Sequence, residues 1–139
     1  MLGHRVYAYG TLQEPSIFRQ IVGRAVPGSP ATLEGYARFA IRGRVYPAII
    51  EQAGARVSGL LYTELDAGEL DLLDTYEGAL YERREVAVLT RDEATSAFTY
   101  VLRAQYRHLL STDAWDHDEF RRNHLATYLA RIAVTARAP

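Results

Sequence analysis

Two carboxyl groups near the end of a predicted helix, those of Asp74 and Glu77, are candidates for proton transfer. Residues three apart share one face of a helix, so the charge of Asp74 disfavours ionisation of Glu77. The carbonyl dipoles at a helix C-terminus act in the same direction, and the ring of Tyr76 can add desolvation. The pattern predicts a raised pKa for Glu77, as general acid–base catalysis near neutral pH requires.

Glu77 also has a second interpretation, as a solvated residue at a helix end. Arg83 and Arg84 follow closely in the sequence. An ion pair between Glu77 and either arginine would cancel the rise in its pKa. The residues alone leave both interpretations open.

The segment Tyr9-Gly10-Thr11-Leu12 is the second candidate for chemistry, because it joins a predicted strand to a predicted helix. A glycine at such a junction lets the backbone pass close to a ligand, and the amides that follow can point together at an anion. The alternative is an ordinary turn in which the glycine serves only the backbone conformation. A single glycine does not decide between them.

The other polar groups give no recognisable catalytic or metal-binding pattern, so we expect no metal ion and no cofactor. Asp113, Asp116, His117 and Asp118 match no ligand spacing and are accounted for by the start of a helix. The chain has no cysteine, which excludes a thiol nucleophile, cysteine–zinc sites and disulfides. Candidate hydroxyl nucleophiles lack a histidine-and-acid arrangement.

The predicted elements that position these residues are short. Helices are expected at 15–22 and 65–76, and a last helix follows Asp116, with Leu125, Tyr128, Leu129 and Ile132 on one face. Asp66 with Glu69, and Asp116 with Glu119, have the spacing of capping boxes. Strands are expected at 5–9, 31–39, 57–65, 81–90 and 95–103, the last two joined by the turn 91–93. The pattern predicts an α+β fold with a small, mainly antiparallel sheet or barrel.

The composition indicates one ordinary globular domain spanning residues 1–139. The chain is 48% hydrophobic and 24% charged, with a net charge of −1 and no clustered basic strip. This argues against a nucleic-acid-binding platform. No apolar stretch approaches the ~20 residues of a membrane span, and no secretory apolar region precedes the first strand, so we expect a cytoplasmic protein without a membrane partner.

Four motifs occur in a fixed order: Tyr9-Gly10-Thr11-Leu12, Tyr46-Pro47-Ala48-Ile49, the run Leu-Asp-x-Tyr-Glu-Gly-x-x-Tyr-x-Arg at 73–83, and Phe98-Thr99-Tyr100-Val101. Together they make residues 5–106 resemble the gamma-glutamylcyclotransferase-like family. The resemblance implies a barrel-like α+β fold with a cavity at one end. It also implies cyclisation of a γ-glutamyl group to 5-oxoproline, with release of the attached amine or amino acid.

The resemblance assigns roles to particular positions. Glu77 matches the family's catalytic acid–base, and the segment Tyr9, Gly10, Thr11 and Leu12 matches the loop whose backbone holds the glutamyl group. Tyr100 matches a strand tyrosine that faces the cavity. The C-terminal helix lies outside the resemblance.

Two other functions remain open for such a fold. One is a module that binds a small carboxylate or amine without turning it over, and the other is an RNA- or protein-interaction barrel. The sequence identifies neither the leaving amine nor the oligomeric state.

Overall fold

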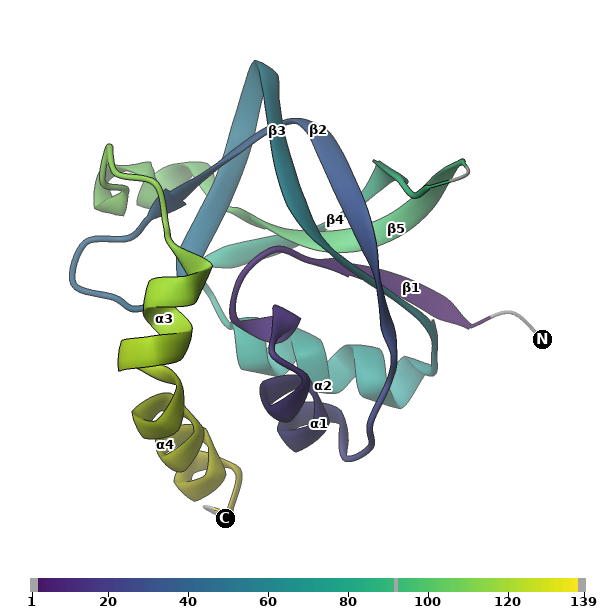
Figure 1. The fold of residues 1–139 in the computed structure, drawn as a ribbon, viewed down its shortest axis with the longest axis vertical. Coiled ribbons are helices and arrows are strands. Elements are labelled where there is room, and N and C mark those ends of the chain that lie inside the picture. Colours follow the sequence, from purple (N-terminus) through teal and green to yellow (C-terminus); the bar gives the residue numbers. More distant parts are fainter. Residues whose placement is uncertain (1–2, 92, 138–139) are drawn as a thin grey trace.

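Five strands close into a barrel in a computed structural model that describes residues 3–91 and 93–137, with side chains through 133 (Figure 1). The strand order around the barrel is β1-β3-β2-β4-β5. The strands are β1 (His4–Ala8), β2 (Gly28–Ala40), β3 (Pro47–Leu65), β4 (Tyr81–Leu89) and β5 (Ala94–Leu102). All pairs are antiparallel except β1 with β5. The predicted α+β fold with a small, mainly antiparallel barrel is confirmed.

The β2–β3 hairpin is longer than the sequence pattern indicates. The expected strands at 31–39 and 57–65 lie inside it, and residues 47–56, for which no strand was predicted, belong to β3 as well. Pairing with β2 extends β3, since Arg38 faces Ile49 and Leu33 faces Val57 in the same ladder. The ladder shifts register beside Gly35, which has φ +84°, a conformation that glycine adopts without strain.

The hairpin of β4 and β5 agrees with its prediction. Nine residues of each strand pair, from Tyr81 with Leu102 to Leu89 with Ala94. At the turn, the amide of Thr90 donates to the carbonyl of Glu93 over 2.9 Å. Asp92, the middle residue of the predicted turn, lies outside the described residues.

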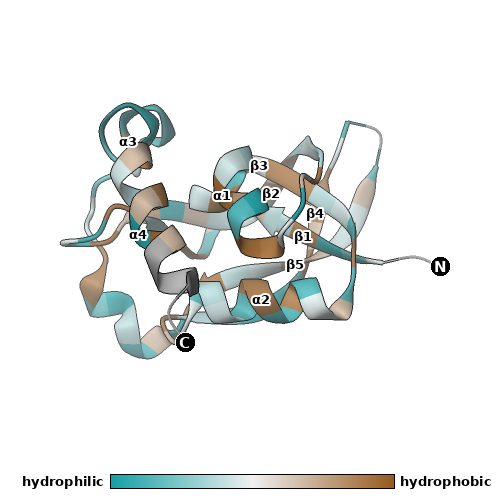
Figure 2. Ribbon diagram, turned by 90° about the horizontal axis from the view of Figure 1, so that it is seen from below, coloured by the Kyte–Doolittle hydropathy of each residue, from teal (hydrophilic) through white to brown (hydrophobic). Residues whose placement is uncertain are grey.

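Helices cover one side of the barrel: α1 (Pro15–Val22), α2 (Ala67–Glu77), α3 (His117–Asn123) and α4 (Leu125–Arg137), with 3-10 turns at 11–13 and 104–109. In Figure 1, α1 and α2 lie below β1, and Figure 2 shows these two helices and α4 on the side of the barrel that faces the viewer. Helix α1 contacts both α2 and α4. The predicted capping box of α2 forms: Asp66 accepts from the Glu69 amide at 2.7 Å, and Glu69 accepts from the Asp66 amide at 3.0 Å. Among the described residues, no helix combines the length and apolar character needed to cross a bilayer.

The last predicted helix is divided in two: α3 ends at Asn123, with His124 as its C-cap, and α4 begins at Leu125. Asp116 caps α3 by accepting from the amides of Asp118 and Glu119. The Glu119 carboxylate does not reach back to complete a box. It lies 3.0 Å from Nε2 of His124 instead, so only half of the predicted box forms.

Strand β1 divides the core into two clusters, because its side chains alternate between opposite faces. Tyr7 and Tyr9 pack in a cluster that includes residues from all five strands, inside the barrel. Val6 and Ala8 belong to a second cluster, shared with the helices. The residues that follow β1 therefore lie at the boundary between the barrel interior and the helices.

Candidate active site

A cavity of about 560 Å³ lies at this junction and contains both candidate segments. Tyr9, Gly10, Thr11 and Leu12 line one part of its wall, and Glu77 lines another. The remaining wall comes from α1, α2, α4, the start of β3 and Tyr81 at the start of β4. The volume lies within the range of small-molecule sites, roughly 300–1,000 Å³. Segments sixty-five residues apart in the sequence thus share one cavity.

Glu77 is the last residue of α2, and its carboxyl makes no hydrogen bond or ion pair with the part of the chain that the structure describes. Burial and, secondarily, the charge of Asp74 raise the pKa of Glu77 to about 8. Glu77 is half-buried at the cavity and is paired with neither Arg83 nor Arg84, so the ion-pair interpretation does not hold. Arg83 binds Asp74 at 2.7 Å, and Arg84 binds two other carboxylates.

Asp74 is held in place by two donors. Its Oδ2 accepts from Arg83, and its Oδ1 accepts from the hydroxyl of Tyr100 at 2.7 Å. Tyr100 is buried on β5 and is not among the residues lining the cavity, contrary to the expectation that it faces the cavity. The Tyr100 hydroxyl therefore orients the Asp74 carboxylate, whose charge raises the pKa of Glu77.

The turn after β1 has its carbonyl groups held by side chains. The carbonyl oxygen of Tyr9 accepts from Arg38 at 2.7 Å and from Nε2 of Gln13 at 2.8 Å. Because a trans peptide directs its N–H opposite to its C=O, this fixes the direction of the Gly10 amide. Within residues 3–91 and 93–137, the amides of Gly10, Thr11 and Leu12 donate to no other group. Three donors are therefore left for a ligand at the cavity wall.

The close approach of Pro47 leaves no room for a side chain at Gly10. Its φ is −125°, outside the left-handed region that favours glycine. A Cβ atom at this position would lie 2.9 Å from Cγ and 3.0 Å from Cδ of the Pro47 ring. The carbonyl of Pro47 is in turn bound by the hydroxyl of Tyr81 at 2.7 Å. The ring thus holds the turn against the start of β3.

Sequence reasoning missed the contribution of α4 to the site. Tyr128 and Arg131 of this helix line the cavity. The hydroxyl of Tyr76 lies 2.6 Å from both Thr11 Oγ1 and the Tyr128 hydroxyl, so a chain of hydroxyl groups joins the turn to α2 and α4. The available signal was the shared helical face of Tyr128 and Ile132, which the sequence pattern assigned only to packing.

The acidic and histidine side chains around α3 serve the fold. Asp116 caps the helix, and His117 lies 3.0 Å from the buried carboxylate of Glu14, which also binds Arg121. Among the described residues, no group of three or more such side chains is arranged to hold a metal ion.

Comparison with known proteins gives consistent results. Residues 6–117 match the family described as "Gamma-glutamyl cyclotransferase, AIG2-like". AIG2-like protein D of Arabidopsis thaliana is 36% identical over 130 residues, which cover 91% of this chain and 84% of the relative. A solution structure of an Arabidopsis thaliana protein has a TM-score of 0.71 at 30% identity, covering 96% of this chain and 81% of that one. A gamma-glutamyl cyclotransferase structure has the same fold, with a TM-score of 0.65 at 16% identity and coverage of 93% and 85%.

Proposed function

The chain belongs to the gamma-glutamyl cyclotransferase, AIG2-like family, and from this membership and the cavity geometry we propose that it is a cyclotransferase. It would convert a γ-glutamyl amine or γ-glutamyl amino acid to 5-oxoproline and the free amine. The observation that carries the proposal is one cavity that holds both a carboxyl of raised pKa, on Glu77, and the free amides of Gly10 to Leu12.

The reaction needs no nucleophile from the protein, because the substrate carries its own. The α-amino nitrogen attacks the γ-carbonyl carbon, a new C–N bond closes the five-membered lactam, and the original amide C–N bond breaks. The α-ammonium loses two protons as the ring closes. One passes to the leaving nitrogen, which departs as the amine, and the other goes to solvent, from which the amine takes up a proton at neutral pH. Holding the two ends of the glutamyl group together can supply ~7–11 kcal/mol of the barrier.

Glu77 is the group proposed to move the proton. Its pKa of about 8 is nearer to the pKa of an amino group than that of an ordinary glutamate, about 4.3. Proton transfer from the substrate ammonium to the Glu77 carboxylate is therefore less unfavourable than it would be with an ordinary glutamate. The same carboxyl can return the proton to the leaving nitrogen, and such acid–base catalysis contributes typically ~10²–10⁴-fold.

The turn at Gly10, Thr11 and Leu12 is proposed to bind the α-carboxylate of the glutamyl group. Three backbone donors whose directions are fixed before binding suit an anion, and they leave the γ-carbonyl free to approach the α-amino group. Gln13 and Arg38 bind the carbonyl oxygen of Tyr9, which points away from the Gly10 N–H in the same peptide group. They therefore hold the turn in place without contacting the substrate.

Substitution of the acid tests the proposal. The parent protein is incubated with a panel of γ-glutamyl amines and amino acids, and 5-oxoproline is measured. Glu77→Gln should lower kcat/KM at least ~100-fold, whereas Glu93→Gln, at an exposed hairpin residue, should not change it. Equal rates for Glu77→Gln and the parent would exclude the assigned role.

The same panel distinguishes the enzyme from a binding module. A protein that only binds γ-glutamyl compounds would gain thermal stability with ligand but release no 5-oxoproline. That result, obtained for the parent across the panel, would replace the enzymatic proposal with the binding one.

A further inference from the structure

One part of the cavity wall is built by side chains of the helices that have no role in the proposed reaction. Ile21 of α1, Leu72 of α2 and Ile132 of α4 line it, together with Arg131. Leu72 is 48% exposed, an unusual position for a large apolar side chain on this protein. Since the glutamyl group is held at Gly10 to Leu12 in the proposed reaction, this part of the cavity is left for the leaving group.

The charged groups on the described cavity wall are Glu77 and Arg131. Glu77 is assigned to proton transfer in the proposed reaction, which leaves Arg131 as the charged group of the wall that can bind a carboxylate. The Arg131 side chain is exposed and reaches the cavity from α4. A guanidinium has five N–H donors in a planar fork, so it can bind a carboxylate in addition to a partner within the protein. The wall therefore provides a second element that recognises an anion.

We propose that Arg131 determines substrate specificity, and that the preferred leaving group is an α-amino acid with an apolar side chain. The inference rests on the proposed cyclotransferase function and adds the chemical class of the released amine. The turn at Gly10 to Leu12 binds the carboxylate of the glutamyl group. Arg131 binds the carboxylate of the amino acid attached to it.

Two features of the site match the two features of such a substrate. A γ-glutamyl amino acid carries two carboxylates. The cavity has two groups that can bind an anion, the turn after β1 and Arg131 of α4. A simple γ-glutamyl amine carries one carboxylate and leaves Arg131 without a ligand. An apolar side chain on the leaving group would cover Leu72, Ile21 and Ile132, and burial of apolar surface adds affinity, at about 25 cal/mol per Å².

A matched pair of substrates tests the inference. γ-Glutamyl-leucine and γ-glutamyl-3-methylbutylamine differ only in the carboxylate of the leaving group. Their kcat/KM values are compared for the parent, for Arg131→Met, and for Arg122→Met, which removes an exposed arginine of α3 that does not line the cavity. Methionine keeps much of the aliphatic stem of arginine and removes the charge.

The parent and Arg122→Met should both prefer the leucine conjugate by roughly tenfold or more, the usual effect of a charge-assisted hydrogen bond. Arg131→Met should bring the ratio of the two kcat/KM values towards one. A parent without the preference, or an Arg131→Met variant that keeps it, would overturn the inference while leaving the cyclotransferase proposal intact.

A binding measurement keeps the two proposals separate when no product forms. Calorimetric affinities for the same two ligands are measured on Glu77→Gln, alone and combined with Arg131→Met. A preference for the leucine conjugate that is lost with Arg131 supports carboxylate recognition even if the parent releases no 5-oxoproline. Equal affinities, or no binding of either ligand, would contradict it.

Discussion

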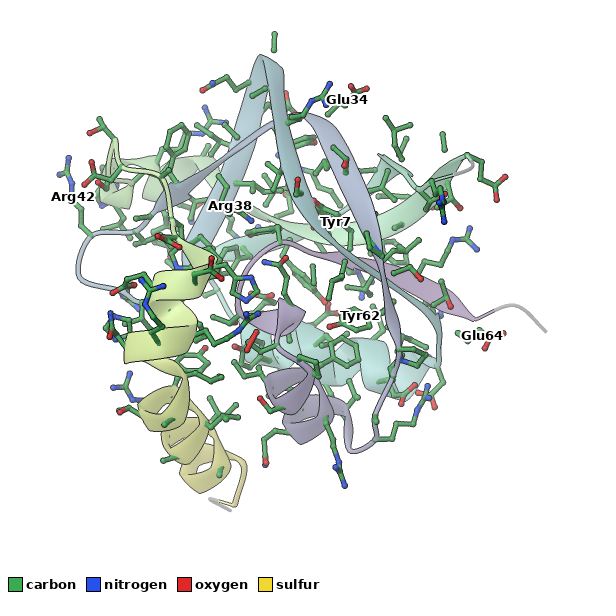
Figure 3. The ribbon with its side chains drawn as sticks, viewed as in Figure 1. Tyr7, Glu34, Arg38, Arg42, Tyr62 and Glu64 are labelled. Atoms are coloured by element: carbon green, nitrogen blue, oxygen red, sulfur yellow. The ribbon has the colours of Figure 1, made fainter. Side chains whose placement is uncertain are left out.

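The guanidinium of Arg38 lies 2.7 Å from the carbonyl oxygen of Tyr9 and joins the β2 strand to the turn after β1. The same nitrogen also donates to the carbonyl of Ser58 on β3 at 3.3 Å. The guanidinium carbon lies 5.5 Å from the centre of the Trp115 ring. Figure 3 shows Arg38 lying over the body of the fold, whereas Arg42 lies at its edge. Arg38 therefore fixes the peptide that carries the Gly10 amide.

Replacement of Arg38 by methionine should weaken substrate binding more than it slows the chemical step. Without the guanidinium, the Tyr9–Gly10 peptide can rotate, and the three amides no longer point together. We expect KM to rise on the order of tenfold, as for loss of a hydrogen bond from a charged group, with a smaller change in kcat. Steady-state kinetics with one γ-glutamyl substrate measures both. Arg42→Met, at an exposed loop residue, is the control, and a purely structural role would lower protein stability without separating KM from kcat.

A methyl group at Gly10 should push the turn away from β3. The Pro47 ring is rigid and cannot move aside for a Cβ atom at 2.9 Å, so the backbone must shift. We expect Gly10→Ala to lower the free energy of unfolding by about 1–3 kcal/mol, as for overpacking, and to reduce activity. Urea denaturation and 5-oxoproline release measure the two effects.

The double variant Gly10→Ala/Pro47→Ala identifies the cause of that loss. Removing the ring leaves room for the added methyl group, so the double variant should lose less stability than the sum of the two single variants. Gly68→Ala serves as a control, because this α2 residue has room for a Cβ atom and alanine favours a helix. Strict additivity at Gly10 and Pro47 would show that the clash is not what excludes alanine.

Local chemistry accounts for the parts of the structure that the sequence predicted well. The capping box joins Asp66 and Glu69, which are three residues apart in the sequence. Asp74 and Glu77 have the same spacing, and the charge of Asp74 raises the pKa of Glu77. Such pairs are set by helix geometry alone. The shared cavity of Glu77 and the turn was expected from the resemblance of several motifs in order, and not from spacing.

The parts that were missed depend on contacts between distant segments. Tyr128 and Arg131 reach the cavity only because α4 packs against α1, and a helix pattern indicates an apolar face without indicating what covers it. The hydroxyl of Tyr100 binds Asp74 instead of entering the cavity because α2 ends beside β5. The full length of β3 likewise follows from its pairing with β2, which strand patterns alone do not reveal.

Removal of the charge on Asp74 should lower the pKa of Glu77 from about 8. Asparagine keeps an oxygen for the Tyr100 hydroxyl but no longer repels a negative charge on Glu77. In Asp74→Asn, a ¹³C-NMR titration of the Glu77 carboxyl should therefore have a lower midpoint, and the low-pH limb of kcat/KM should move to lower pH. Asp71→Asn, at an exposed position on α2, is the control. A midpoint unchanged by Asp74→Asn would leave burial as the sole cause of the raised pKa.

Glu77 should also make the stability of the protein depend on pH, with a sign opposite to that of a paired carboxylate. Its pKa is 4.5 when unperturbed and about 8 in the fold, so the folded state binds the proton more tightly than the unfolded state. The stabilisation from this protonated carboxyl is complete below pH 4.5 and is lost as the pH rises to about 8.

Glu77→Gln removes that ionisation and should reveal its contribution. The variant should gain stability relative to the parent as the pH rises from 5 to 8, and the difference should stay constant above pH 8, because Glu77 is then ionised in both states of the parent. Urea denaturation of both proteins at pH 5, 7 and 9 measures the difference. Glu93→Gln controls for loss of a surface charge. If the curves of parent and Glu77→Gln ran parallel between pH 5 and 9, Glu77 would titrate as an ordinary exposed carboxyl, and its proposed catalytic role would lose its physical basis.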